Sequence, residues 1–148
     1  MVDESAVGRV GQPFDMVVER GKIREFARAT LSASPEYLDD PVPVSPPTFL
    51  VNAAFWTPPG ENPLTVLGLD LRRLLHGAQE FVFHGPPPRA GAELHARTRV
   101  DKVYEKEGRR GGTMTFVETV TEFRDGQGAL VAEARSTAIE TARAPEES

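Results

Sequence analysis

The sequence predicts an α+β domain in which a curved antiparallel sheet wraps around one buried helix. Residues 49–56 are apolar on every side except at Asn52, which is typical of a helix with no solvent-facing side. From Phe81 onward, apolar and polar residues alternate over several segments, as they do in half-buried strands. A helix followed by long strands indicates one layer packed on another, and the pattern alone leaves several α+β folds open.

The segments before this helix differ in character. Residues 14–18 predict a first strand, and residues 31–44, rich in Ser, Pro and Asp, predict a loop. A helix is expected over residues 21–30, where one face recurs at helical spacing. That face carries Ile23, Phe26, Ala27 and Thr30.

The central helix is expected to open at Ser45-Pro46-Pro47-Thr48. Serine is a preferred N-cap, and proline fits the first helical position because its missing N–H is not needed there. Thr57-Pro58-Pro59-Gly60 is expected to end this helix.

The second half of the chain predicts strands. They are expected at residues 80–84, 94–100, 113–123 and 130–141, with a charged, glycine-rich loop at 105–112. On the last strand, one face carries mostly small side chains, as if a helix lay close against it. These are Leu130, Ala132, Ala134, Ser136 and Ala138.

Composition restricts the possible functions. The 148 residues fit one domain, expected at 12–141, with loose segments at 1–11 and 142–148. A net charge of −5 repels phosphate backbones, so no nucleic acid partner is expected. No apolar run is long enough for a membrane span or a signal peptide, so we expect a cytoplasmic protein. The absence of cysteine excludes disulfides and thiolate sites, and we expect no metal or cofactor.

Five stretches resemble the MaoC-like dehydratase family, and more closely its N-terminal, fatty-acid-synthase-like branch. They are GKIREFARAT at 21–30, PPTFL at 46–50, GLDLRRLLHGAQEFVFHGPPPRAG at 68–91, RTRVDKVYEKEGRRGGTMTF at 97–116 and ARSTAIET at 134–141. The resemblance implies a hotdog fold, a dimer, and an acyl-CoA or acyl-carrier-protein thioester as ligand. In similar mycobacterial hydroxyacyl thioester dehydratases, one hotdog subunit supplies catalysis and its sister stabilises the acyl chain.

Active members of the family carry a motif that reads roughly Gly-Asp-x-Asn-Pro-x-His after the first helix, with Asp and His as the acid–base pair. Aligned on the proline, this chain has Ser32 in place of the Asp, Ser34 in place of the Asn and Tyr37 in place of the His. Serine does not titrate near neutral pH, and tyrosine has an ordinary pKa of about 10. The usual catalytic pair is therefore absent, although Ser32 and Tyr37 remain candidates by position.

A second departure concerns the thioester oxygen. The resemblance implies that backbone N–H groups at the start of the central helix bind this oxygen. Pro46 and Pro47 occupy that region, and proline has no N–H to donate.

Other residues are candidates for substrate binding. His76 is expected either to contact an acyl thioester and replace the missing base, or to be structural. Gln79 shares its parity with Phe81, so we expect it to face the interior. Asn52 and Trp56, in the central helix, are the remaining candidates.

Three further features favour ordinary surface structure. His84 has the opposite parity to Phe81 and is expected at the surface or an interface. Residues 109–112 (Arg-Arg-Gly-Gly) resemble a phosphate cradle, but a solvated hairpin tip is favoured. The acidic residues Glu36, Asp39 and Asp40 have no neighbouring histidine, so no metal site is expected there.

Three functions remain open. The favoured one is an acyl-thioester-binding, non-catalytic subunit of an enoyl-CoA or enoyl-ACP hydratase (a 3-hydroxyacyl thioester dehydratase), paired with a catalytic MaoC-like subunit in fatty acid or polyketide metabolism. The second is a self-sufficient homodimeric dehydratase that uses residues such as His76. The third is a binding or scaffold protein without chemistry.

Overall fold

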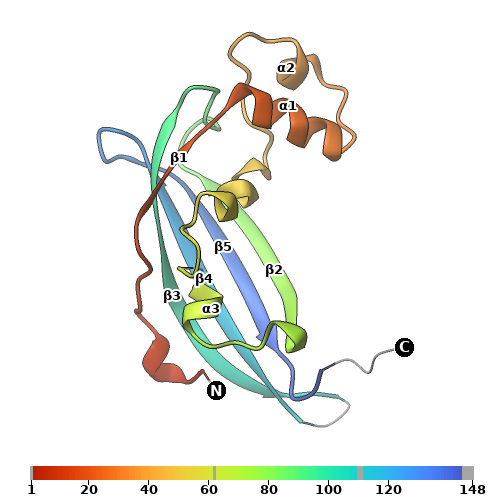
Figure 1. The fold of residues 1–148 in the computed structure, drawn as a ribbon, viewed down its shortest axis with the longest axis vertical. Helices are drawn as coiled ribbons and strands as arrows, with labels where there is room; N and C mark the ends of the chain where they lie inside the picture. Colours follow the sequence, from red (N-terminus) through yellow and green to blue (C-terminus); the bar gives the residue numbers. More distant parts are fainter. Residues whose placement is uncertain (1, 62, 110–111, 145–148) are drawn as a thin grey trace.

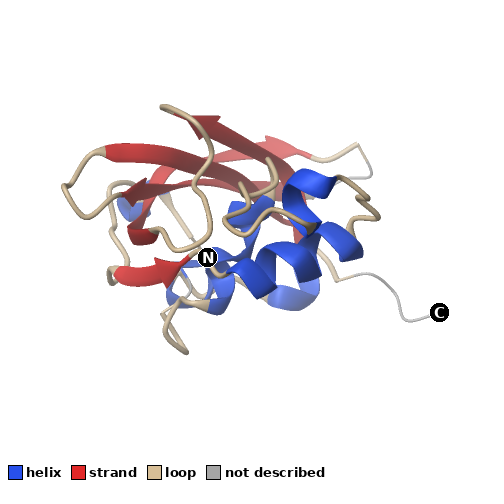
Figure 2. Ribbon diagram, turned by 90° about the horizontal axis from the view of Figure 1, so that it is seen from above, coloured by secondary structure: helices blue, strands red, loops and turns tan. Residues whose placement is uncertain are grey.

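The computed structural model describes residues 2–61, 63–109 and 112–144. Within these ranges, five strands form one antiparallel sheet in the order β1-β3-β4-β5-β2. They are β1 (Phe14–Val17), β2 (Leu74–Phe83), β3 (Glu93–Glu107), β4 (Thr113–Arg124) and β5 (Leu130–Glu140). The sheet is curved, and most helical segments lie on one side of it (Figures 1 and 2). The predicted α+β arrangement is therefore confirmed, with β1 and β2 at the two edges.

The helical segments of the described chain are short apart from one. They are η1 (Glu4–Ala6), α1 (Arg20–Ala29), α2 (Pro35–Leu38), η2 (Phe49–Phe55), α3 (Pro63–Val66) and η3 (Leu71–Arg73), where η marks a 3₁₀ helix. The first strand and the helix after it match the sequence prediction, and Ile23 and Ala27 are buried on the expected face of α1. The loop expected at 31–44 contains the single turn α2, whose Pro35 occupies a position that tolerates a missing N–H.

The central helix starts later than expected. The prediction of Ser45 as its N-cap is wrong, because the Ser45 N–H donates to the Pro88 carbonyl at 2.9 Å and Val44 forms a bridge with Arg89. The Ser45 hydroxyl is buried and finds no hydrogen-bond partner among the described residues. Helical structure begins only at Phe49 and is of the 3₁₀ type.

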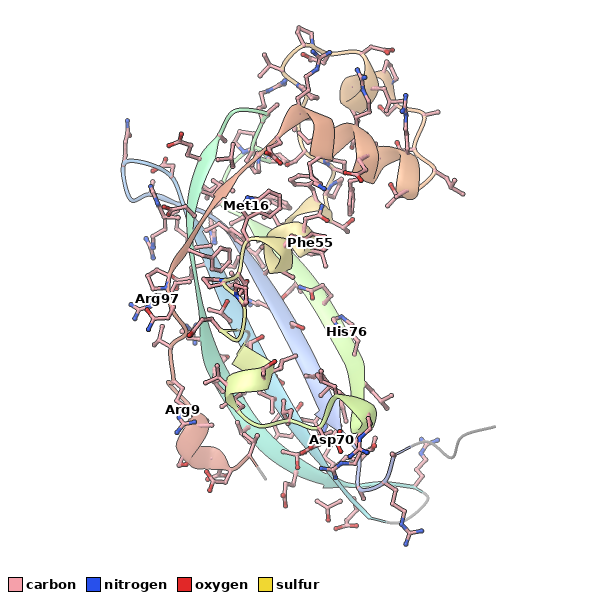
Figure 3. The ribbon with its side chains drawn as sticks, viewed as in Figure 1. Arg9, Met16, Phe55, Asp70, His76 and Arg97 are labelled. Atoms are coloured by element: carbon pink, nitrogen blue, oxygen red, sulfur yellow. The ribbon has the colours of Figure 1, made fainter. Side chains whose placement is uncertain are left out.

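The expectation that this helix is buried on every side is also wrong. Phe49 and Leu50 are fully buried, whereas Val51 is 50% exposed and Phe55 is 78% exposed. A seven-residue helix lying on one sheet presents one face to that sheet, and a single chain has nothing to cover the other. The uncovered face of η2 lies in front of the sheet in Figure 3, where Phe55 is labelled.

The main hydrophobic core lies between the sheet and the pair α1 and η2. Phe49 packs edge to face against Phe26, with ring centres 5.7 Å apart. The sheet contributes fully buried Phe123 and Ala132 to the same core. The small side chains expected on one face of β5 do lie beneath the helix, since Ala134 and Ser136 share a cavity wall with η2 residues.

The segment before β1 was expected to be loose, and this expectation is wrong for the residues described. Val2 and Ala6 are only 5% and 4% exposed, and they pack with Val100 and Val117 in a second core. The Gly8 N–H donates to the Val100 carbonyl at 2.9 Å. These contacts cover the part of the sheet that the short helix η2 does not reach. At the other end, residues 142–144 are exposed, and 145–148 lie outside the described residues.

A polar contact closes the end of the sheet opposite α1. The carboxylate of Glu140, 6% exposed, accepts hydrogen bonds from the Asp70 N–H at 2.9 Å and from Arg73 at 2.7 Å. The Thr141 N–H donates to the Arg73 carbonyl at 2.9 Å. These bonds attach the end of β5 to η3, the turn that leads into β2. No helix in the described ranges is long and apolar enough to cross a membrane.

Replacing Glu140 tests this attachment. Glu140→Ala leaves the Asp70 N–H without its acceptor and removes one acceptor of the Arg73 guanidinium, which still donates to the Thr141 carbonyl at 3.1 Å. We expect the free energy of unfolding to fall by about 2 kcal/mol. Urea denaturation followed by circular dichroism measures the change. Arg72→Ala is the control, because the Arg72 side chain is 83% exposed, and its loss is expected to lower the stability much less. Equal stability of the two variants would contradict the assignment.

Candidate functional site

The segment that resembles the hydratase motif begins where α1 ends. Leu31 has a φ of 59°, in the left-handed region that favours glycine. The Leu31 N–H donates to the Arg28 carbonyl at 3.0 Å, and the Ser32 N–H donates to the Ala27 carbonyl at 2.8 Å. This pair of bonds is a Schellman helix end. Leu31 stands where the motif has its glycine, so this chain places a leucine in a left-handed conformation at that position.

The two residues at the acid–base positions make no catalytic arrangement. Ser32 is half-buried, and its hydroxyl accepts a long hydrogen bond of 3.4 Å from the Ser34 N–H. Tyr37 is half-buried and packs against the main core. Within the described residues, neither side chain hydrogen-bonds to a titratable group. The two positions of the acid–base pair therefore carry neither a carboxylate nor an imidazole.

The start of η2 offers few donors for a thioester oxygen. Pro46 and Pro47 have no N–H. The Phe49 N–H donates to the Pro46 carbonyl at 3.0 Å, so it is already engaged within the chain. Of the residues at the position where the family resemblance places an oxyanion site, Thr48 is the one that keeps its N–H for a ligand.

A cavity of about 200 Å³ lies between η2 and the sheet. Its apolar wall comes mainly from η2, through Leu50, Val51, Ala53 and Ala54, and from Phe14 and Phe123. Its opposite wall is polar and comes from the strands. That wall comprises Gln79, Thr98, Thr119, Thr121 and Ser136. A pocket between an apolar lid and a few converging polar groups is the usual form of a small-molecule site.

The strand register brings these polar residues together. Thr98 lies opposite Thr121, and their hydroxyl oxygens are 2.8 Å apart. In the neighbouring row, Thr119 lies opposite Ser136, and Ser136 lies opposite Gln79. Sequence reasoning missed the threonines. Their spacing of two residues along β4 was the available signal, because it places both hydroxyls on one face of the strand.

The four proposed substrate-binding residues fall in different places. Gln79 lines the cavity, and its amide nitrogen donates to the Arg135 carbonyl at 3.1 Å. Asn52 is 8% exposed, and its amide nitrogen has no hydrogen-bond partner in the described part of the chain. Trp56 is half-buried against the main core. His76 is exposed on β2, the edge strand, opposite Ala138 (Figure 3). Asn52, Trp56 and His76 are not among the residues that line the cavity.

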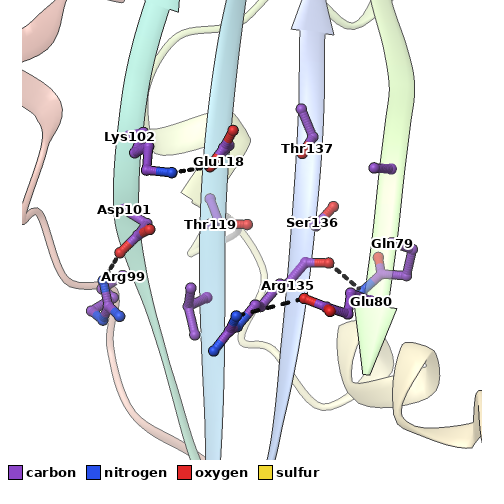
Figure 4. A pocket seen from close by; sticks show the side chains of 12 residues that line it. Gln79, Glu80, Arg99, Asp101, Lys102, Glu118, Thr119, Arg135, Ser136 and Thr137 are labelled. Atoms are coloured by element: carbon purple, nitrogen blue, oxygen red, sulfur yellow. Dashed lines mark hydrogen bonds and ion pairs between the residues drawn. The ribbon is translucent and has the colours of Figure 1, made fainter. Parts of the chain in front are cut away.

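The outer face of the sheet carries a second hollow of about 370 Å³, which Gln79, Thr119 and Ser136 also line (Figure 4). Its charged residues pair with one another: Arg99 with Asp101, Lys102 with Glu118 at 3.3 Å, and Arg135 with Glu80 at 3.6 Å. Charges neutralised by their neighbours leave little to attract a charged ligand. We therefore place the candidate site in the cavity beneath η2.

His84, expected at the surface, is partly exposed and contacts Glu133 at 2.8 Å. The hydrogen bond from His84 lowers the pKa of the Glu133 carboxyl below its ordinary value, and Arg135 adds to this effect. Arg109 is exposed at the β3–β4 hairpin, and Arg110 and Gly111 of the suggested phosphate cradle lie outside the described residues. No cluster of three or more potential metal ligands occurs among the residues described.

Comparison with known proteins identifies consistent relatives. The family described as "FAS1-like, dehydratase domain region" matches residues 5–134. A UPF0336 protein of Saccharopolyspora erythraea is 33% identical over 156 aligned positions, which cover 98% of this chain and 96% of the relative. Another UPF0336 protein, of Parafrankia, is 34% identical over 140 positions and covers 86% of each chain.

Solved structures agree with this family match. The C-terminally truncated HadBC (3R-hydroxyacyl-ACP dehydratase) complex of Mycobacterium tuberculosis contains a chain with a TM-score of 0.72 and 27% identity, covering 90% of this chain and 96% of that one. A MaoC-like dehydratase gives a TM-score of 0.77 at 22% identity, covering 92% of this chain and 42% of that one. The predicted hotdog fold and the resemblance to MaoC-like dehydratases are confirmed.

The strained helix end after α1 leads to a stability prediction. Leu31→Gly removes the steric cost of a left-handed Cβ, and Leu31 is 92% exposed, so little packing is lost. We expect the free energy of unfolding to rise by about 0.5–1 kcal/mol, measured by urea denaturation. Ser34→Gly is the matched control, because Ser34 has a φ of −63° and glycine there only adds backbone freedom. A Leu31→Gly variant less stable than Ser34→Gly would contradict the prediction.

Proposed function

Since this chain belongs to the FAS1-like dehydratase family, we propose that it is an acyl-thioester-binding, non-catalytic subunit of an enoyl thioester hydratase. The observation that carries the proposal is the state of the motif segment. The fold of the family is retained, whereas Ser32 and Tyr37 stand at the positions of its acid and base. In this proposal, the chain keeps the fold of the enzyme without its acid–base groups.

The free edge of the sheet supports a partner subunit. β2 pairs with β5 on one side only, and six of its ten residues are exposed. An exposed edge strand presents unpaired backbone groups that another sheet can bind. The uncovered apolar residues Val51 and Phe55 of η2, with Leu75 of β2 at 50% exposure, add side chains that favour burial. We therefore propose that β2 and η2 form the subunit interface.

The partner is a different chain in this proposal. A dimer of two identical copies would carry Ser32 and Tyr37 in both halves and would lack an acid–base pair altogether. Hydration of an enoyl thioester requires one group that takes a proton and one that gives it. A MaoC-like subunit with an intact Asp and His would supply both. The similar HadBC chain is itself part of a 3R-hydroxyacyl-ACP dehydratase complex, which supports this assignment.

The alternative of a self-sufficient enzyme depends on His76. This side chain is exposed at the sheet edge and does not line the cavity beneath η2. His76 makes no hydrogen bond to a carboxylate in the described part of the chain, so nothing orients its ring as a general base. The non-catalytic role is therefore the better supported one.

Activity of the purified chain separates the two roles. Loss of two general acid–base groups removes on the order of 10²–10⁴-fold in rate for each, so we expect no measurable hydration of crotonyl-CoA by this chain alone. Co-expression with a MaoC-like chain that keeps Asp and His is expected to give an active complex. Robust hydration by the isolated chain that disappears in His76→Ala would establish the self-sufficient enzyme instead.

The subunit interface can be tested separately. Phe55→Glu places a charge on the exposed face of η2, so we expect association with the catalytic chain to weaken by at least about tenfold in sizing experiments. Val7→Glu is the control, because Val7 is 47% exposed and follows η1, whose contacts are with β3 rather than with β2. Equal association of the two variants would place the interface elsewhere.

A further inference from the structure

The wall of the cavity formed by the sheet is unusually polar for the buried face of a sheet. Five hydrogen-bonding side chains from four strands meet there. Three of them follow one another in direct register: Thr119 on β4, Ser136 on β5 and Gln79 on β2. They form a polar row, defined here as Thr119, Ser136 and Gln79, which crosses from the interior of the sheet to its free edge.

The hydroxyls of this row are not used within the chain. Thr98 and Thr121, beside the row, satisfy each other at 2.8 Å. By contrast, the side chains of Thr119 and Ser136 make no hydrogen bond to any described residue, and both line the cavity. Because these hydroxyls are not engaged within the chain, they are free to hydrogen-bond to a polar group that enters the cavity.

The direction of the polar row determines which part of a ligand it meets. On the proposed function, the catalytic groups belong to a partner that joins at the β2 edge. The reacting carbons of the acyl group then lie on the partner's side of that edge. The remainder of the acyl group enters this chain past Gln79 and meets Ser136 and then Thr119. The polar row therefore contacts carbons beyond those that react.

The opposite wall and the cavity volume restrict the polarity and the size of the rest of the ligand. Leu50, Ala53 and Phe123 provide an apolar surface for methylene groups. The volume of about 200 Å³ is below the range of about 300–1,000 Å³ that is usual for drug-sized ligands. We infer that the cavity binds a short acyl group that carries a hydroxyl or carbonyl oxygen on a carbon beyond the reacting ones. This inference rests on the proposed function and specifies its substrate class.

The test compares two thioesters that differ by one oxygen. Hexanoyl-CoA and 5-hydroxyhexanoyl-CoA are titrated into the full chain by isothermal calorimetry. One hydrogen bond to a neutral group changes affinity by about three- to tenfold, so we expect the hydroxylated thioester to bind more tightly by that factor. In the variant Thr119→Val/Ser136→Ala, we expect the preference to disappear while hexanoyl-CoA binds as tightly as before, within about twofold.

Two controls keep the result interpretable. Thr137→Val alters a threonine on the outer face of β5, next in sequence to Ser136, and is expected to keep the preference. Ser136→Ala alone is the second variant in case the double substitution does not fold, because alanine already occupies positions 134 and 138 of the same face. It is expected to reduce the preference by at least about half.

The outcomes separate this inference from the proposed function. Equal binding of both thioesters by the wild-type chain overturns the inference and leaves the acyl-binding role intact. A preference that survives in Thr119→Val/Ser136→Ala also overturns it, because the oxygen would then be recognised elsewhere. Binding of neither thioester removes the acyl-binding role, and the inference with it.

Discussion

The packing of one short helix against one curved sheet governs the rest of this structure. Phe49 and Leu50 of η2 reach the sheet and are fully buried there, together with Phe123. A helix of seven residues is about 14 Å long at the 3₁₀ rise, so it covers only part of strands that run to 15 residues. The N-terminal segment through Val2 and Ala6 covers another part. Two features follow from this partial cover: the cavity beneath the helix and the exposed face of the helix that bears Phe55.

Most of the fold was predicted from the spacing of apolar residues along the chain. Where that prediction failed, contacts between residues far apart in sequence are the reason. The strands and α1 follow from alternation and helical spacing, because each buries one face. Ser45 matched the N-cap pattern, but its N–H is taken by Pro88, which is 43 positions away in sequence and could not be read from local residues. Val2 and Ala6 are too few to form a pattern, so a loose segment was the natural expectation. Gln79 was correctly expected to share the face of Phe81. Thr119 could be assigned to the polar row only from the strand register, which places it opposite Ser136.

The motif segment combines a strained backbone with side chains that differ from the family's acid–base pair. A left-handed non-glycine residue costs about 1–2 kcal/mol, and Leu31 bears this cost without burying its side chain. The segment that follows places Tyr37 against the main core. Tyrosine at this position contributes apolar area to the core, which a catalytic histidine would have to leave accessible. On the proposed function, the segment serves packing instead of acid–base chemistry.

The location of the polar row connects ligand binding to subunit association. Gln79 belongs both to the row and to the free edge strand β2. A partner sheet added to β2 would lie beside the outer end of the row and would reduce the access of water to it. Hydrogen bonds strengthen when water is excluded, so an acyl group would bind more tightly to the assembled pair than to this chain alone. By linkage, the bound acyl group would strengthen the association of the two subunits by the same factor. On the proposed function, the open edge and the free hydroxyls are two consequences of one arrangement, in which a subunit without catalytic groups completes the binding site of a subunit that has them.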